Sequence, residues 1–352
     1  MKTVGIDLTY ITNIEGVSGE EVFSLGILKG LYDSGRKQQI IVFANESTKK
    51  QLQTIYPGIH VVSVKKHGRK FYGRRLKILL RRNPVDVFYY PHIHSRINVG
   101  LKCETAVTVH GMKSKKITRS EYRRMNRRLR KVNFIAAASD FVKNEILIKN
   151  KSIPSDKVIV IHNPVTDLRQ GVDIVLKKKF ILAVSNDTAQ ENLIAVLKAF
   201  NMVKDEIPHD LVIIGTVSEK SRAYRYIKRY DMKSRIIITG IINRDILFGY
   251  YRDADLFVNA STYMGFGYTP VEALACGTKV LTTRIPSVSA IPDVECDGYI
   301  NNPHRYPEIA NKMLITIFKG AEKSMLEERA AKVRSFYSLS GAAEKYAAMM
   351  GL

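Results

Sequence analysis

Short apolar runs recur along the whole chain and are separated by longer segments in which apolar residues have helical spacing. Most of these runs are continuously apolar rather than alternating, as in parallel strands that helices cover on both faces. The segments between them are long enough for crossover helices. The pattern predicts an α/β fold of two doubly wound, Rossmann-like domains that face each other across a cleft. The predicted strands are 4–8, 39–43, 61–64, 85–90, 106–109, 134–138, 158–161, 180–184, 211–214, 236–239, 256–259 and 280–282.

The chain has 352 residues, which is enough for two domains with separate cores. Residues 163–179 have few apolar side chains and contain Pro164, Gly171 and a run of three lysines, which is typical of a linker. We therefore expect an N-terminal domain over 1–165 and a C-terminal domain over 166–335. Residues 336–352 have a helical pattern, and this helix either completes the second domain or packs back on the first.

The segment 263–277, with the sequence YMGFGYTPVEALACG, has the pattern of a phosphate-binding loop that leads into a helix. Gly265 and Gly267 allow a sharp turn and a close approach of a ligand to the backbone. Thr269 is the predicted N-cap, with Pro270 at the first helical position and Glu272 completing a capping box. The free N–H groups at a helix N-terminus attract anions. Because the loop follows the predicted strand 256–259, it belongs at a carboxyl end of the sheet, where such folds bind ligands.

Several features indicate a soluble protein of a reducing compartment. Cys103, Cys276 and Cys296 are odd in number and far apart, which argues against disulfides and against a zinc cluster. No apolar run approaches the roughly 18 residues that span a bilayer. The first residues alternate as in a strand and lack the apolar core of a secretory signal. We expect a cytoplasmic protein that associates peripherally with the inner face of the membrane.

The net charge of +23 is concentrated in two segments of the first half. Residues 64–82 carry nine Lys and Arg and no acid, and residues 113–131 carry ten against Glu121 alone. Each segment has one narrow apolar seam, and the remaining faces are basic. With so few acids nearby, ion pairing within a helix does not account for the charge. The expected surface patch for an anionic membrane or an acceptor comprises Arg74, Arg75, Arg81, Arg82, Arg123, Arg124, Arg127 and Arg128. No nucleic-acid-binding module is recognisable, so nucleic acid is not an expected partner.

Five segments, taken in chain order, form a further pattern. They are 16–19 (GVSG), 108–111 (TVHG), 136–141 (AAASDF), 161–165 (IHNPV) and 255–277. In this order they resemble the motifs of glycosyltransferase family 4, whose members have the two-domain GT-B fold. The resemblance covers nearly the whole chain, and five ordered motifs are more specific than any one of them.

The resemblance implies a retaining, metal-independent transfer of a hexosyl or deoxyhexosyl group from a nucleotide diphosphate sugar. It assigns the nucleotide sugar to the second domain and a glycan or lipid-linked acceptor to the first. Glu272 would bind the ribose, Gly265–Gly267 and the following helix would hold phosphate, and His110 would contact the donor sugar or the acceptor. No metal or other cofactor is implied. The expected donor-binding residues are Gly16, Gly19, Asn186, Met264, Gly265, Phe266, Gly267, Tyr268, Thr269, Glu272 and Arg284.

Three positions depart from the family pattern. The first acidic residue of the signature is Met264, and the family's Arg and Lys after the first strand of the second domain are Asn186 and Glu191. Such cations would neutralise the departing diphosphate. Either the donor and geometry differ, or another cation such as Arg284 substitutes, or the protein is a non-catalytic partner or glycan-binding subunit.

Other residues have plainer alternatives. Glu272 could serve only as the capping-box acid, and His110 could be a structural residue at a strand end. His92 and His94 follow a predicted strand, but no third metal ligand is apparent. Asp253 and Asp255 spell the Asp-x-Asp of metal-dependent transferases, and we interpret them instead as an N-cap and a strand-entry feature.

Overall fold

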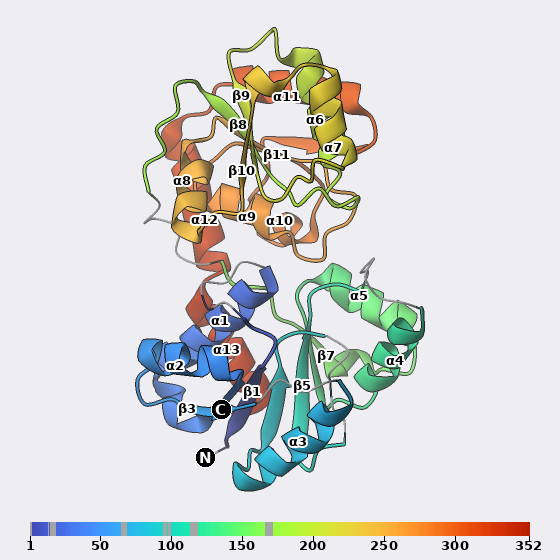
Figure 1. Cartoon of the computed structure of the whole chain (residues 1–352), viewed down its shortest axis with the longest axis vertical. Helices are drawn as coiled ribbons and strands as arrows, with labels where there is room; N and C mark the ends of the chain where they lie inside the picture. Colours follow the sequence, from blue (N-terminus) through green and yellow to red (C-terminus); the bar gives the residue numbers. More distant parts are fainter. Residues whose placement is uncertain are drawn as a thin grey trace. The chain divides into compact units, whose positions relative to one another are not determined.

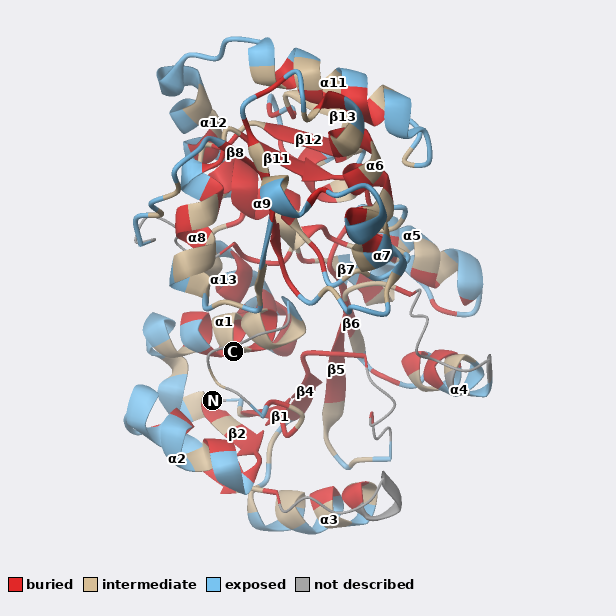
Figure 2. Ribbon diagram, turned by 45° about the horizontal axis from the view of Figure 1, so that its top comes forward, coloured by how far each residue is buried: buried red, intermediate tan, exposed pale blue. Residues whose placement is uncertain are grey.

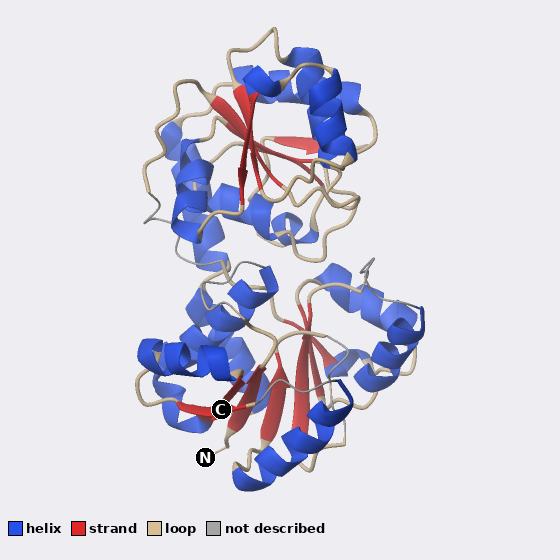
Figure 3. Ribbon diagram, in the orientation of Figure 1, coloured by secondary structure: helices blue, strands red, loops and turns tan. Residues whose placement is uncertain are grey.

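A computed structural model describes residues 2–12, 14, 19–64, 69–93, 97, 100–112, 119–165 and 172–352, without the side chains of 69–71, 119 and 121. The chain divides into two compact units. The first unit comprises Met1–Pro164 together with Tyr337–Leu352, and the second comprises Val165–Phe336. Each unit has one parallel sheet with helices on both faces (Figures 1 and 3). The central strands of both sheets are buried, whereas the edge strands β7 and β10 are partly exposed and the outer faces of the helices are exposed (Figure 2).

The sheet of the first unit has the order β3-β2-β1-β4-β5-β6-β7, and all its described pairings are parallel. Every strand predicted in this half is confirmed, with ends within two residues of those expected. The strand order reverses between β1 and β4, which makes this the switch point of the sheet. The strands are β1 (Val4–Leu8), β2 (Ile40–Ala44), β3 (His60–Ser63), β4 (Val87–Tyr90), β5 (Glu104–Val109), β6 (Phe134–Ala137) and β7 (Val158–Val160).

The helices of the first unit form two layers. The side chains of α3 (Arg69–Arg82), α4 (Arg119–Leu129) and α5 (Asp140–Lys149) pack into one cluster with alternate residues of β4–β7. The C-terminal helix α13 (Leu339–Met350) packs against α1 (Gly19–Leu31), because Gly30 brings the two backbones close; a Cβ there would lie 2.7 Å from that of Ala343. Just after α1, Arg36 forms a bidentate ion pair of 2.7 and 2.8 Å with Glu344 of α13. The remaining elements are α2 (Glu46–Ile55) and the short turns η1 (Tyr32–Arg36), η2 (Lys37–Gln39) and η3 (Ser155–Lys157).

The sheet of the second unit has the order β10-β9-β8-β11-β12-β13, again parallel, with its switch point between β8 and β11. The five predicted strands are confirmed to within one residue. The edge strand β13 was not predicted, because it has only three residues and no apolar run. The strands are β8 (Phe180–Val184), β9 (Asp210–Ile214), β10 (Ile236–Gly240), β11 (Leu256–Asn259), β12 (Val280–Thr283) and β13 (Gly298–Ile300).

The helices of the second unit also form two layers. Apolar residues of α6 (Leu193–Val203), α7 (Arg222–Arg229) and α11 (Tyr306–Phe318) share one core with the sheet. Helix α9 (Tyr268–Ala275) packs against both α8 (Arg244–Asp253) and α12 (Lys323–Phe336). Tyr251 of α8 contacts Phe257 of β11 with ring centroids 5.7 Å apart, so α8 also covers the sheet. The shorter elements are α10 (Pro286–Ser289) and η4 (Lys233–Arg235).

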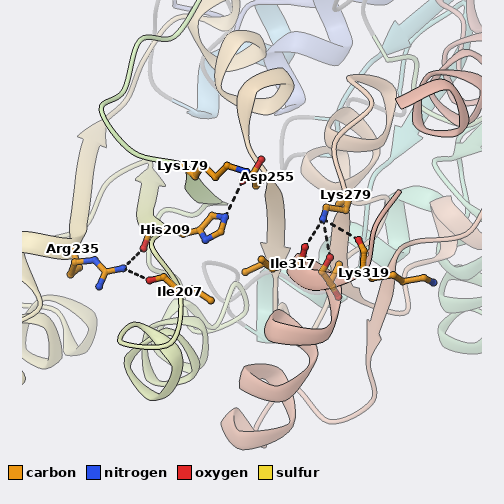
Figure 4. A network of polar contacts seen from close by, with 9 residues as sticks. Lys179, Ile207, His209, Arg235, Asp255, Lys279, Ile317 and Lys319 are labelled. Carbon is orange, nitrogen blue, oxygen red and sulfur yellow. Dashed lines mark hydrogen bonds and ion pairs between the residues drawn. The ribbon is translucent and has the colours of Figure 1, made fainter. Parts of the chain in front are cut away.

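Charged residues at the amino ends of these strands hold the second sheet together (Figure 4). Asp255, which enters β11 as predicted, pairs with His209 Nε2 at 2.9 Å and Lys179 Nζ at 3.2 Å. The guanidinium of Arg235 donates to the carbonyls of His209 and Ile207 at 2.5 and 2.9 Å. Lys279 donates to the carbonyls at the C-terminal end of α11. The charged residues at the amino ends of these strands therefore stabilise the fold.

The Asp-x-Asp sequence belongs to this structural edge. Asp253 is the last residue of α8 rather than an N-cap, which corrects that part of the interpretation. Its carboxylate accepts a hydrogen bond from the backbone N–H of Ile174 at 3.0 Å and pairs with Arg252 at 2.9 Å. The two aspartates thus hold the chain segment before β8 and the entry of β11.

Candidate functional site

The loops after β8 and β11 meet at the switch point of the second sheet. The backbone N–H of Thr262 donates to the carbonyl of Gln190 at 2.8 Å. The side-chain amide of Asn192 donates to the carbonyl of Ala260 at 3.1 Å. These contacts tie the glycine loop after β11 to the loop after β8, at the sheet edge where doubly wound folds bind ligands.

Helix α9 begins two residues earlier than its capping pattern suggests. It spans Tyr268–Ala275, its N-cap is Gly267, and Gly267 has a φ of 92°. Thr269 therefore lies inside the first turn and is not the N-cap, and Glu272 does not complete a capping box. The physical reason is that Gly267 adopts a left-handed conformation that other residues rarely adopt, so the helix starts immediately after it.

The surroundings of Gly267 are tight and partly apolar. A Cβ at this position would lie 3.1 Å from Ile285 Cδ1, 3.4 Å from Met264 Sδ and 3.5 Å from Ser287 Oγ. The half-buried Met264 thus lies back over the start of α9. Beside it, the rings of Phe266 and Tyr268 make an edge contact with centroids 5.1 Å apart, and Phe266 is buried. Gly265 is partly exposed.

The carboxylate of Glu272 is buried and already has partners. Arg244 Nη2 donates to Oε1 at 2.7 Å, and the Tyr251 hydroxyl donates to Oε2 at 3.1 Å. The Arg244 guanidinium also lies over the ring of Phe248, 4.8 Å from its centroid. Burial acts to lower the pKa of Arg244, but the neighbouring Glu272 carboxylate outweighs it and raises that pKa. Sequence reasoning missed Arg244, since no motif marks a lone arginine at a helix start.

The loop after β8 has a carboxylate where the family pattern has a cation. Glu191 Oε2 accepts hydrogen bonds from the backbone N–H groups of Asn186 and Thr188, at 3.0 and 3.1 Å. Asn186 Oδ1 in turn accepts from the backbone N–H of Thr216 in the loop after β9, at 3.2 Å. Thr188-x-x-Glu191 has the spacing of a capping box, a signal that could have predicted these contacts.

Arg284 follows β12 and is exposed. Its guanidinium lies 4.6 Å from the ring centroid of Tyr299 on the edge strand β13. No hydrogen bond from Arg284 to the glycine loop is present among the described residues. Its suggested role as a substitute cation stays a prediction.

In the first unit, His110 directly follows β5 and is partly buried. Its Nε2 lies 3.0 Å from the carbonyl of Pro91; because a carbonyl only accepts, Nε2 carries the hydrogen and Nδ1 is left as an acceptor. The ring packs edge-on against Phe23 at 4.5 Å and lies 5.7 Å from His92, which contacts the Glu20 carboxylate. Burial and, second, the nearby His92 lower the pKa of His110 to about 4, so the ring is neutral at pH 7.

Two further sequence predictions concern this part of the first unit. Gly19 is the first residue of α1, and Gly16 lies outside the described residues. His94 also lies outside them. Where side chains are described, no group of three or more His, Cys, Asp or Glu is placed to hold a metal ion.

The basic helices α3 and α4 have the predicted amphipathic pattern. Tyr72 and Leu76 of α3 and Met125 and Leu129 of α4 are buried in the same core cluster, so both helices cover one face of the first sheet. Burial and the like charge of Arg124 lower the pKa of Arg128. Of the eight predicted patch residues, Arg75 and Arg128 are half-buried, and the exposed ones are Arg74, Arg81, Arg82, Arg123, Arg124 and Arg127.

No helix in the described part of the chain is both long and apolar enough to cross a membrane.

Comparison with protein families gives two adjoining matches. Residues 17–167 match the model described as Glycosyltransferase Family 4, and residues 165–333 match the model described as Glycosyl transferases group 1. Together the two matches extend over nearly the whole chain.

Two curated relatives match part of the chain. A serotype-specific mannosyltransferase, WbdA of Escherichia coli, is 28% identical over 196 residues, which are 51% of this chain but 24% of WbdA. The N-acetylgalactosamine-N,N'-diacetylbacillosaminyl-diphospho-undecaprenol 4-alpha-N-acetylgalactosaminyltransferase of Campylobacter jejuni is 29% identical over 143 residues. That match covers 40% of this chain and 38% of the relative. The matched region thus spans well under half of either relative.

A solved structure extends the likeness to the whole chain. Anabaena HepE, in complex with UDP and glucose, superposes with a TM-score of 0.76 at 14% identity and covers 100% of both chains. At this identity the likeness shows the fold, which is the two-domain GT-B architecture.

Proposed function

Because this chain belongs to glycosyltransferase family 4, we propose that it moves a sugar from a nucleotide diphosphate sugar to a glycan or lipid-linked acceptor in polysaccharide or glycoconjugate biosynthesis. The observation that carries the proposal is the glycine loop and helix start at the switch point of the second sheet, Met264–Tyr268. A helix N-terminus preceded by two glycines gives backbone N–H groups to an anion such as a diphosphate.

We assign the donor to the second unit. Gly265, Gly267 and the first turn of α9 would hold phosphate, and the Arg244–Glu272 pair would meet the ribose. Glu272 has two partners but each carboxylate oxygen can accept a further hydrogen bond, so a ribose hydroxyl can be added once the buried pair opens. HepE binds UDP and glucose, which supports a donor of this kind.

We assign the acceptor to the first unit, where neutral His110 has an acceptor nitrogen for a hydroxyl group. The exposed arginines of α3 and α4 would hold an anionic membrane surface at the inner face of the membrane. The Campylobacter jejuni relative acts on a diphospho-undecaprenol, which supports a lipid-linked acceptor. The transfer would retain the anomeric configuration and need no metal.

The first experiment is a thermal-shift screen against UDP-, GDP- and dTDP-sugars. A nucleotide at 100 times its Kd stabilises the folded chain by about 2.7 kcal/mol. Binding should be lost in Gly267→Ala, which alters the loop, and kept in Gly320→Ala, where a Cβ would meet open space. If every nucleotide leaves the melting temperature unchanged, the proposal is wrong.

A positive donor is then tested for turnover with glycolipid acceptors. Proton NMR of the first-formed product reports whether the anomeric configuration is retained. Turnover that survives excess EDTA supports the metal-independent mechanism. A product of inverted configuration would overturn the retaining mechanism. Activity that is lost in EDTA and restored by a divalent ion would overturn metal independence.

The second candidate is a non-catalytic partner of another transferase. It is motivated by Met264, Asn186 and Glu191, three departures from the family pattern within one edge of the sheet. It predicts nucleotide or glycan binding without turnover until a second chain is added. Turnover by the purified chain alone would exclude it.

A further inference from the structure

Four hydrogen bonds converge on one carboxylate oxygen of Glu191, at the sheet edge where doubly wound folds bind ligands. One oxygen, Oε2, accepts from Asn186 N at 3.0 Å, Thr188 N at 3.1 Å and Thr188 Oγ1 at 2.9 Å. The Ser185 hydroxyl adds a longer contact of 3.4 Å. Backbone and hydroxyl donors that converge on one anionic oxygen give charge-assisted hydrogen bonds, which are stronger than neutral ones.

The backbone of this loop has the geometry of an anion-binding concavity. Asp187, which lies between the two backbone donors Asn186 and Thr188, has a left-handed φ of 53°. The N–H groups on either side of Asp187 therefore point to the same carboxylate oxygen, and N–H groups that converge in this way make a nest for an anion. In this chain the anion in the nest is the side chain of Glu191.

The loop after β8 is fixed at the carboxyl ends of the strands of the second sheet. It follows β8, and the Gln190 carbonyl is bonded to Thr262 of the β11 loop at 2.8 Å. Gly215, after β9, approaches it so closely that a Cβ would lie 2.2 Å from the Ser185 carbonyl oxygen. Because neighbours on both sides hold the loop, the carboxylate has a fixed position.

We propose that Glu191 fills the anion nest at the switch point of the second sheet, so that this chain binds its donor with the diphosphate outside that nest. Glu191 is thereby a specificity-determining residue: its negative charge weakens the contribution of the diphosphate to donor affinity. The diphosphate lies instead against Gly265–Gly267 and the start of α9. That Glu191 fills the nest follows from its contacts alone, whereas its effect on donor affinity rests on the proposed function.

The first arm of the test measures stability and needs no donor. Glu191→Ala empties the nest and should lower the Tm by several degrees, since backbone donors lose their partner. Millimolar sodium pyrophosphate, compared with NaCl at equal ionic strength, should restore part of that loss, so that it raises the Tm of the variant more than that of the wild type, which has only the glycine loop for the anion.

A matched control separates the nest from general salt effects. Glu308 also accepts from a backbone N–H, that of Asn301 at 2.9 Å, and pairs with Lys312. Glu308→Ala should lose stability without selective recovery in pyrophosphate. An unchanged Tm for Glu191→Ala, or equal recovery in both variants, would overturn the assignment of a nest.

The second arm measures the Kd of a nucleoside and of its diphosphate, for uridine/UDP and guanosine/GDP, in wild type and in Glu191→Gln. The amide keeps the shape and an acceptor oxygen but removes the charge. The gain in affinity from nucleoside to diphosphate should be about fivefold larger in the variant, from one unit charge at roughly 4 Å in water. An equal or smaller gain in Glu191→Gln would overturn the specificity role.

The two experiments distinguish failure of the proposed donor function from failure of the nest assignment. If no nucleotide binds either protein, the proposed donor function fails, while the pyrophosphate result still decides whether Glu191 fills a nest.

Discussion

Arg244 donates a hydrogen bond of 2.7 Å to Glu272, and the carboxylate that accepts it is almost fully buried, with 3% of the side chain exposed. Removing one partner of a buried pair leaves an uncompensated charge, whereas replacing both by apolar residues is often nearly neutral. This asymmetry allows the structural role of Glu272 to be separated from a role in binding ribose.

We expect Glu272→Ala to lower the free energy of unfolding by about 3 kcal/mol, because Arg244 is left without its partner. The double variant Arg244→Met/Glu272→Leu should recover most of that loss. Nucleotide affinity should remain low in the double variant if the carboxylate binds ribose. Chemical denaturation and isothermal titration calorimetry measure the two quantities. A double variant that binds nucleotide like the wild type would leave Glu272 with a structural role only.

The start of α9 depends on Gly267 for two reasons, its φ of 92° and the Ile285 methyl 3.1 Å from an added Cβ. Gly267→Ala should cost about 2 kcal/mol, since the left-handed conformation alone costs 1–2 kcal/mol for other residues. Gly240 has a φ of 74° but open space around it, so Gly240→Ala isolates the conformational part at about 1 kcal/mol. Denaturant titrations of both variants and Gly320→Ala measure the differences. Equal losses at 267 and 240 would mean that the contact with Ile285 contributes nothing.

The environment of His110 predicts a pH dependence of stability. The pKa in the folded chain is about 4, below the ordinary 6.5, because of burial and the nearby His92. The unfolded chain therefore binds the proton more tightly, and stability falls as the pH decreases from about 6.5 toward 4, by at most about 3 kcal/mol. His110→Gln should make the free energy of unfolding less dependent on pH in this range. His60→Gln, which removes an exposed imidazole, should leave that dependence unchanged. NMR titration of the His110 Hε1 signal measures the pKa directly, and a midpoint above 6 would contradict the prediction.

The basic face of α4 should bind anionic membranes. Arg123 and Arg127 of α4, and Arg130 in the turn that follows it, are exposed; the helical spacing places them opposite the buried Met125 and Leu129. Their replacement by Gln should weaken binding to phosphatidylserine vesicles about 100-fold, at about 1 kcal/mol for each basic residue.

The control removes the same charge elsewhere. Arg222, Arg225 and Arg229 of α7 are exposed in the second unit, and their replacement by Gln should change vesicle binding little. Co-sedimentation at two ionic strengths measures both triple variants, and binding should weaken with salt. Equal losses in both variants would show that net charge, rather than the α4 face, is responsible.

Much of the fold was predictable because parallel strands buried on both faces leave continuous apolar runs in the sequence. The predicted strands are confirmed, as are the family and the two-domain GT-B fold. The three-residue strand β13 was missed, since its register on β12 depends on partners 17 residues away rather than on its own pattern.

The partners of the site residues were less predictable. The sequence places Gly267, Thr269 and Glu272 at the start of one helix, and the pattern Thr-x-x-Glu favours a capping box there. In the structure the left-handed Gly267 starts the helix earlier, and Glu272 turns to Arg244 and Tyr251. A capping box is present instead at Thr188–Glu191, in the loop after β8.

The sequence by itself determined the family, the parallel sheets, the glycine loop at a strand's carboxyl end and the concentration of arginines on two helices. Those features depend on the spacing of residues close together in the sequence, because backbone geometry fixes which of them form a strand, a turn or one face of a helix. Only the tertiary structure decided which charges meet. Arg244 reaches Glu272 from 28 residues away, because this pairing is set by how α8 and α9 pack on one sheet.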